Sequence, residues 1–209
     1  MNLLCLHTAA SNIAIFDDAA ASLATTARPL NHLVMPDWLA EAERSGGMTA
    51  ELRVRIARLI DSLLPQMDAI VITCSTLAPV ADDFVAAGQH GWVLRSDKML
   101  AEALQRHKGP SVALCAAEST LDATRSLFCR AGSEVEVRLV EGAWAAFKAG
   151  DSAGYFALIA DAVQQAYQQG AGQVALAQSS MTPVAQQFAV SQRPLTAPHL
   201  ALQACYALR

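Results

Sequence analysis

The chain has 209 residues, which suits one large domain or two small ones of about 100 residues each. Hydrophobic residues make up 53% of it and charged residues 16%, so a sizeable core is available and disorder is disfavoured. The net charge is −4, from 15 basic and 19 acidic residues, and no basic stripe is present. This balance disfavours binding to nucleic acid.

Membrane and export signals are weak. No stretch reaches the roughly 18 uninterrupted apolar residues of a membrane span, and the N-terminal residues lack a basic start and a small-residue cleavage site. The five cysteines are odd in number and form no CxxC pair. They suit free thiols in a reducing cytosol and argue against structural zinc. We therefore expect a cytoplasmic protein with no membrane partner and no metal.

In the first half, short apolar runs predict strands over residues 3–6, 31–35, 68–73 and 92–94. The run Ala69-Ile70-Val71-Ile72 is the strongest, and its continuity favours a strand covered on both faces of a parallel sheet. Helical spacing predicts helices over 19–23, 49–63, 81–87 and 98–106. Thr49 is expected to cap the second helix and Asp97 the fourth.

The second half repeats this alternation. Strands are predicted over 111–115, 135–140, 173–177 and 194–196, and helices from residue 120 through 130 and over 144–148, 151–168 and 184–188, with a last helix opening at Pro198. Alternating strands and helices imply βαβ units with right-handed crossovers. We predict an α/β fold of two similar doubly wound lobes with parallel sheets, flavodoxin-like or Rossmann-like. The first lobe comprises residues 1–97 plus 196–209, and the second residues 98–195.

Polar residues collect where four of these strands end. Ligands of open parallel sheets bind beyond the carboxyl ends of the strands. Helix N-termini at such positions favour an anion such as a carboxylate. The groups concerned are small and hydroxyl-rich: His7-Thr8, Cys74-Ser75-Thr76, Glu118-Ser119-Thr120 and Gln178-Ser179-Ser180.

Cys74 is the candidate for chemistry, because it closes a strand and opens a polar turn. A helix N-terminus at that point would lower the pKa of its thiol. The other four cysteines are interpreted as small buried hydrophobes. The serines and threonines after the strands also serve as ordinary helix caps, and Glu118 suits the first turn of a helix without any ligand.

At these residues the sequence resembles the aspartate/glutamate/hydantoin racemase superfamily, in a subgroup of small proteins. The matching pieces extend over nearly the whole chain: Leu6-His7-Thr8, Thr73-Cys74-Ser75-Thr76, Ala117-Glu118-Ser119-Thr120-Leu121, Leu176-Ala177-Gln178-Ser179-Ser180-Met181 and Pro194-Leu195-Thr196-Ala197-Pro198. The resemblance implies two α/β lobes with the active site between them. It also implies proton exchange next to a carboxylate, without a cofactor, by one thiol on each face.

The resemblance assigns the first thiol to Cys74 and substrate binding to its neighbours Ser75 and Thr76 and to the second-lobe pair Ser119 and Thr120. The position of the second thiol holds Gln178, followed by Ser179 and Ser180. A glutamine cannot exchange a proton as a thiol does at neutral pH. We therefore expect a one-thiol variant with Cys74 and Gln178 as the facing catalytic positions.

Three hypotheses follow. The first is a cofactor-independent isomerase of a small carboxylate, with a decarboxylase of the arylmalonate type as its one-cysteine alternative. The second is a carboxylate-binding protein on the same scaffold that has lost its chemistry. The third is a thiol hydrolase pairing Cys74 with His7 or His199. The scarcity of Arg and Lys at the strand ends and the absence of a GxGxxG motif disfavour nucleotides, and the resemblance is compatible with a homodimer or a larger homo-oligomer.

Overall fold

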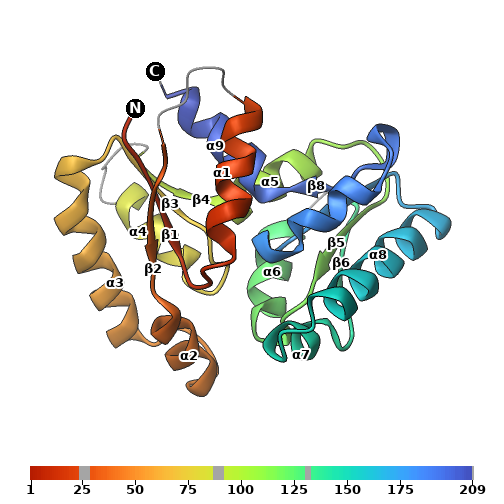
Figure 1. The fold of residues 1–209 in the computed structure, drawn as a ribbon, viewed down its shortest axis with the longest axis horizontal. Coiled ribbons are helices and arrows are strands. Elements are labelled where there is room, and N and C mark those ends of the chain that lie inside the picture. Colours follow the sequence, from red (N-terminus) through yellow and green to blue (C-terminus); the bar gives the residue numbers. More distant parts are fainter. Residues whose placement is uncertain (24–28, 87–91, 130–132, 209) are drawn as a thin grey trace. The chain divides into compact units, whose positions relative to one another are not determined.

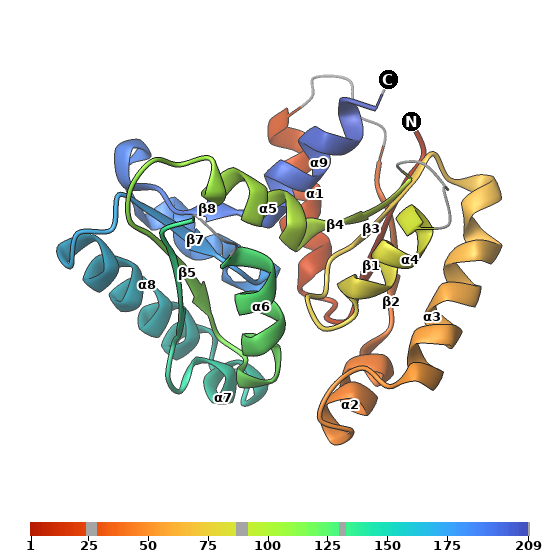
Figure 2. The same ribbon diagram turned by 180° about the vertical axis from the view of Figure 1, so that it is seen from behind.

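The computed structural model describes residues 1–23, 29–86, 92–129 and 133–208, and these residues form two compact units. The first comprises Met1–Asp97 with Pro198–Arg209, and the second comprises Lys98–Ala197. Each unit has its own parallel sheet with helices on its faces, as Figures 1 and 2 show from opposite sides. The predicted fold class is confirmed.

The first unit is built around a sheet in the order β2-β1-β3-β4, all strands parallel among its described residues. Its elements are β1 (Leu3–His7), α1 (Asn12–Leu23), β2 (Asn31–Val34), α2 (Pro36–Arg44), α3 (Ala50–Leu63), η1 (Leu64–Gln66), β3 (Ala69–Ile72), η2 (Ala78–Val80), α4 (Ala81–Ala86) and β4 (Val93–Arg95).

The second unit repeats this order as β6-β5-β7-β8, again parallel throughout. Its elements are α5 (Ser96–Gln105), which begins at the unit boundary, β5 (Ser111–Cys115), η3 (Glu118–Thr120), α6 (Leu121–Phe128), β6 (Val135–Leu139), α7 (Ala143–Lys148), α8 (Ser152–Gln168), β7 (Gln173–Leu176), η4 (Ser179–Gln187), η5 (Val190–Gln192) and β8 (Leu195–Thr196). The last helix, α9 (Ala197–Tyr206), follows β8 in the chain but belongs to the first unit.

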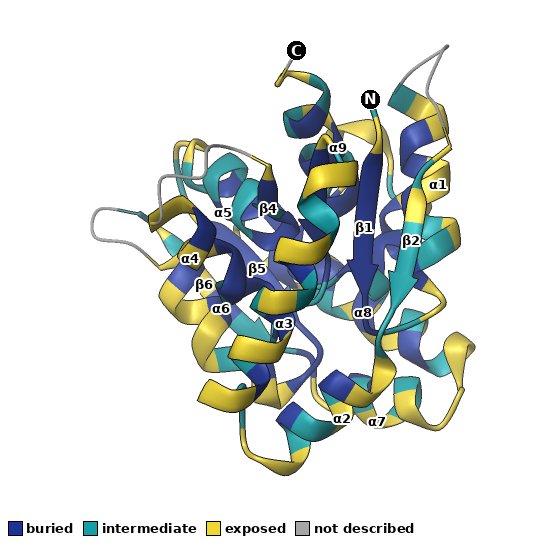
Figure 3. Cartoon of the chain, turned by 90° about the vertical axis from the view of Figure 1, so that its left-hand side faces the viewer, coloured by how far each residue is buried: buried dark blue, intermediate teal, exposed yellow. Residues whose placement is uncertain are grey.

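Burial explains why the central strands have continuous apolar runs. Every residue of β1 and of β3 is buried. By contrast β2 is exposed or half-buried, and Figure 3 shows it in yellow and teal beside the dark blue β1. On one face of the first sheet, α1 and α9 pack through Phe16, Ala201 and Cys205 against Leu3 and Cys5. On the other face, α3 buries Leu52, Ile56 and Ile60 in a separate cluster.

Several local predictions hold and others need correction. Thr49 caps α3, because its side chain accepts a hydrogen bond from the backbone of Leu52 at 3.1 Å. Asp97 does not cap its helix from outside: α5 already begins at Ser96, and the Asp97 carboxylate binds Arg95. Of the helix predicted over 184–188, residues 184–187 belong to the 3-10 helix η4, which contains Pro183, and Phe188 is extended. The predicted helix ends at residues 87 and 130 lie outside the described residues.

Candidate active site

The first unit has a switch point between its two central strands. The chain leaves β1 toward β2 on one side and leaves β3 toward β4 on the other, so the loops after β1 and β3 diverge. Ligands of open α/β sheets bind at such points. His7 ends β1 and Thr8 follows it, while Cys74 lies two residues after the end of β3. The structure therefore brings these two predicted groups together, and the Thr8 hydroxyl lies close enough to the Cys74 thiol to lower its pKa.

Cys74 is half-buried, and burial raises the pKa of its thiol above the ordinary value of 9.0. Hydrogen bonds from the Thr8 hydroxyl and from the backbone at Leu77 and Thr76 lower the pKa, but only in part. The expectation of a lowered thiol pKa was wrong. The turn after Cys74 leads into the three-residue η2 and the six-residue α4, and this short helical segment does not outweigh desolvation. A thiol whose pKa is raised above 9.0 is protonated at neutral pH.

Three buried polar oxygens at the strand ends have no regular hydrogen-bond partner among the described residues. They are Thr76 Oγ1 and Asn12 Oδ1 in the first unit and Thr182 Oγ1 in the second. Thr76 also belongs to the polar environment of the Cys74 thiol, at a looser contact than a regular hydrogen bond. A buried polar group without a partner costs free energy unless a ligand or water binds it. Asn12 and Thr182 were missed by the sequence reasoning, although each lies a few residues beyond a predicted strand-end group.

The His7 imidazole is fully buried, and other groups hold both of its nitrogens. Nδ1 lies 2.8 Å from Thr73 Oγ1, and Nε2 lies 2.9 Å from Nδ1 of His32. Burial, with His32 as a second cause, lowers the pKa of His7 to about 4. His199 likewise places Nε2 2.9 Å from the hydroxyl of Ser22. Neither histidine is among the groups that shift the pKa of Cys74, so the contacts do not support a Cys–His hydrolase.

In the second unit, Gln178 joins the ends of the two central strands. Its Oε1 accepts hydrogen bonds from the backbone N–H of Ala116 at 2.6 Å and of Ala117 at 3.3 Å. Its Nε2 donates to Thr120 Oγ1 at 3.2 Å. A pair of adjacent backbone N–H groups is the usual ligand of an anion, and here the protein's own carboxamide occupies it. Gln178 is thus placed to hold the loop after β5.

The remaining second-unit candidates have differing environments. Ser179 is buried, and Ser180 shares a 2.8 Å hydrogen bond with the hydroxyl of Tyr155. Burial raises the pKa of Tyr155 to about 12, so its phenol stays protonated at neutral pH. Glu118 and Ser119 are exposed and make no side-chain hydrogen bond to other described residues. The structure therefore groups Thr120 with Gln178 but leaves Glu118 and Ser119 outside that cluster.

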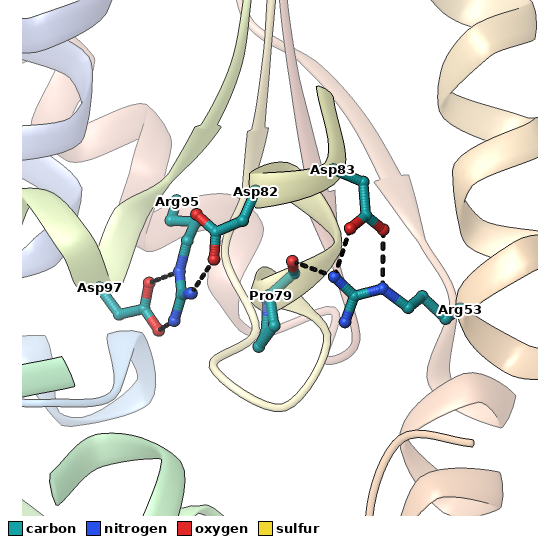
Figure 4. A network of polar contacts seen from close by, with 6 residues as sticks. All are labelled: Arg53, Pro79, Asp82, Asp83, Arg95 and Asp97. Carbon is teal, nitrogen blue, oxygen red and sulfur yellow. Dashed lines mark hydrogen bonds and ion pairs between the residues drawn. The ribbon is translucent and has the colours of Figure 1, made fainter. Parts of the chain in front are cut away.

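Two arginines form hydrogen bonds and ion pairs with the segment that follows Cys74 (Figure 4). Arg53 on α3 donates to the carbonyl of Pro79 at 3.0 Å and to the carboxylate of Asp83 at 2.7 Å. Arg95, at the end of β4, donates to Asp82 at 2.7 Å and to Asp97 at 3.0 Å. Arg95 is a cation at a strand end, yet two carboxylates already neutralise it. The network fixes η2 and α4 and provides no free cation for a substrate.

Comparisons place this fold among racemases. No protein-family model matches the sequence, and no curated protein matches it. Among solved structures, a glutamate racemase from Bacillus anthracis is similar with a TM-score of 0.68 at 11% identity, over 99% of this chain and 81% of the other. The Picrophilus torridus aspartate racemase gives 0.66 at 12% identity, over 98% and 94%. An allantoin racemase from Klebsiella pneumoniae gives 0.66 at 14% identity, over 100% and 87%.

Proposed function

The chain has the two-lobed fold of the Asp/Glu and allantoin racemases, and we propose that it is a cofactor-independent isomerase of this type. It acts at the carbon next to a carboxylate of a small acid, through the single thiol of Cys74. The observation that carries the proposal is the position of Cys74 at the switch point, in contact with the Thr8 hydroxyl. In the described residues, no helix is long and apolar enough to cross a membrane.

The groups around Cys74 supply the binding half of the mechanism. Hydroxyl groups of Thr8, Ser75 and Thr76 and the free oxygen of Asn12 line the loops after β1 and β3. Hydroxyl and backbone N–H donors stabilise a carboxylate. They stabilise more strongly the enediolate that forms when the neighbouring carbon loses a proton or CO₂. In isomerisation the Cys74 thiolate, whose population rises with pH, first takes the proton from that carbon and leaves the enediolate. The thiol formed in this step then returns a proton to the carbon, and the configuration inverts when the enediolate has turned its other face toward Cys74.

Gln178 takes no proton in this proposal. Its carboxamide holds the N–H groups of Ala116 and Ala117, so the site has one thiol where a two-base racemase has two. We assign Ser179, Ser180, Ser119, Thr120 and Glu118 to substrate binding as predictions from the sequence, with Gln178 as their positioning residue. Exposure of Glu118 and Ser119 makes Ser180 and Thr120 the stronger candidates of this set.

A second function, decarboxylation followed by protonation, is favoured by the raised pKa of Cys74. Loss of CO₂ from a substituted malonate leaves an enediolate and needs only one proton donor. A thiol that is protonated at neutral pH meets that need without a second base. Isomerisation and decarboxylation differ in one product, since only the second releases CO₂.

The test is a panel of small amino acids, hydantoins and substituted malonates incubated with the protein in D₂O. Deuterium at the carbon next to the carboxylate is read by NMR, and released CO₂ is measured in parallel. We expect incorporation by the wild type and a loss of at least about a hundredfold in Cys74→Ala, the lower range for a general acid–base group. The matched control is Cys129→Ala, which removes an exposed thiol. Equal activity in the Cys74 variant refutes the assignment, and tight binding without turnover assigns the scaffold to binding alone.

A further inference from the structure

A cysteine and two histidines converge inside the first unit, away from Cys74. Cys5 and His7 are two residues apart on β1, so their side chains point to the same face of the sheet. His32 on β2 is the register partner of Cys5 in the parallel pair. One ligand atom of each residue lies within 4.8 Å of the others. Cys5 and His7 are fully buried, and His32 is half-buried.

Oxygen acceptors hold the outward nitrogens of both imidazoles. The Thr73 hydroxyl donates to the carbonyl of Leu6 at 3.0 Å, so its oxygen accepts from Nδ1–H of His7 at 2.8 Å. On the other ring, Nε2–H of His32 donates to the carboxylate of Asp17 at 3.1 Å. In neutral imidazoles these bonds leave a lone pair on Nε2 of His7 and another on Nδ1 of His32.

The two lone pairs face each other at 2.9 Å. Such a pair is repulsive unless a cation lies with it, and the cation is either a proton or a metal ion. A proton at this point would pair with the Asp17 carboxylate alone, whereas a metal ion would also bind the third group that converges here, the Cys5 thiol. The edge of the His7 ring also contacts Phe16 at a centroid distance of 5.3 Å, so one side of the cluster is apolar. An apolar shell of this kind limits the access of water to the ligands.

We propose that Cys5, His7 and His32 bind one Zn²⁺ or a similar divalent transition metal. Sulfur and imidazole nitrogen are ligands for such metals, whereas Mg²⁺ and Ca²⁺ require oxygen. Asp17 and Thr73 accept hydrogen bonds from the imidazole nitrogens that face away from the metal, and they orient the two histidines as in the carboxylate–histidine–metal arrangement. Three protein ligands leave a fourth position for water or an added ligand. The metal would enter from the side of Asp17, whose side chain is 52% exposed.

A site of this kind would join β1, β2, α1 and the end of β3, because its ligands and their acceptors come from these four places. Binding displaces the thiol proton of Cys5, whose pKa burial raises and a bound metal lowers. The expected result of metal binding is therefore a more stable first unit. The expectation of a metal-free protein rested on the lack of clustered Cys and His in the sequence, and this set is dispersed over residues 5–32.

The test is titration of the full chain, stripped of metal by chelator, with Co²⁺ and then Zn²⁺. We expect one equivalent of Co²⁺ with a thiolate-to-metal absorption band, displacement by Zn²⁺, and a higher unfolding temperature with Zn²⁺. His32→Ala should weaken binding by more than tenfold, and Asp17→Asn by about tenfold to a hundredfold. Both changes lie at half-buried or exposed positions, so the variants should fold.

Cys74→Ala and Cys129→Ser are the controls for the other accessible thiols, and both should keep the band and the affinity. The proposal is overturned if no stoichiometric binding occurs. It is equally overturned if the thiolate band is absent, or if binding survives His32→Ala and is lost with either control.

Discussion

Replacing Gln178 with alanine removes the acceptor of two backbone N–H groups at the end of β5. Those groups belong to Ala116 and Ala117, which are 2% and 1% exposed, so water reaches them poorly. A buried donor left without a partner costs about 1–3 kcal/mol. The 2.6 Å hydrogen bond from Ala116 accounts for most of this cost, and the 3.3 Å hydrogen bond from Ala117 for less. We expect Gln178→Ala to lower the free energy of unfolding by about 2–3 kcal/mol.

The assay is equilibrium urea unfolding, combined with hydrogen exchange at the amides of Ala116 and Ala117, which should accelerate in Gln178→Ala. The control is Gln165→Ala, an exposed position on α8, where we expect a change within about 0.5 kcal/mol. In Gln178→Glu the introduced carboxylate can still accept the hydrogen bonds from both backbone N–H groups. The two N–H bonds would lower the pKa of this carboxylate in the folded protein. The variant should therefore be stabilised above the unfolded-state pKa of about 4.3, and this stabilisation should be lost as the pH falls through the folded-state pKa. Unchanged unfolding and unchanged exchange in Gln178→Ala would refute the assigned role.

Two further predictions concern the Cys74 loop. Thr8→Val should raise the pKa of Cys74 further, because the Thr8 hydroxyl lowers that pKa in the wild type. Thr8→Ser keeps a hydroxyl and should leave the pKa unchanged. The pH midpoint of alkylation at Cys74 measures the difference, and an identical midpoint in both variants would contradict the prediction. Arg95→Met should cost about 3 kcal/mol or more of unfolding free energy, because it removes the cation that neutralises the buried Asp97 carboxylate. Arg53 is more exposed, so Arg53→Met should cost less than about 1 kcal/mol. Equal losses in urea unfolding of the two arginine variants would be inconsistent with this difference in burial.

The strands were predictable because their apolar runs record burial directly. The run at residues 69–72 is buried at every position, as a strand covered on both faces requires. Helix α2 was missed for a local reason. It begins at Pro36, directly after the strand predicted over residues 31–35. Proline fits the first position of a helix as well as the end of a strand, and α2 has no side-chain cap to mark its start.

The position of Cys74 was predictable, and its electrostatics were not. A strand end followed by small polar residues marks the place, but the pKa of the thiol depends on burial by distant segments and on Thr8 from another strand. The cluster of Cys5, His7 and His32 depends on the register of β1 with β2. The embedding of Gln178 depends on a contact between the ends of β5 and β7. Pairings of this kind are fixed by the tertiary fold.

Deuterium incorporation in D₂O by the wild type and by Cys74→Ala tests the central claim most directly, because it records proton delivery to carbon whatever the final product. The account predicts deuterium next to the carboxylate of a substrate with the wild type, at least about a hundredfold less with Cys74→Ala, and no loss with Cys129→Ala. It also predicts that, with a single thiol, deuterium enters the starting enantiomer faster than the opposite enantiomer forms. Labelling that persists undiminished without the Cys74 thiol would contradict the account.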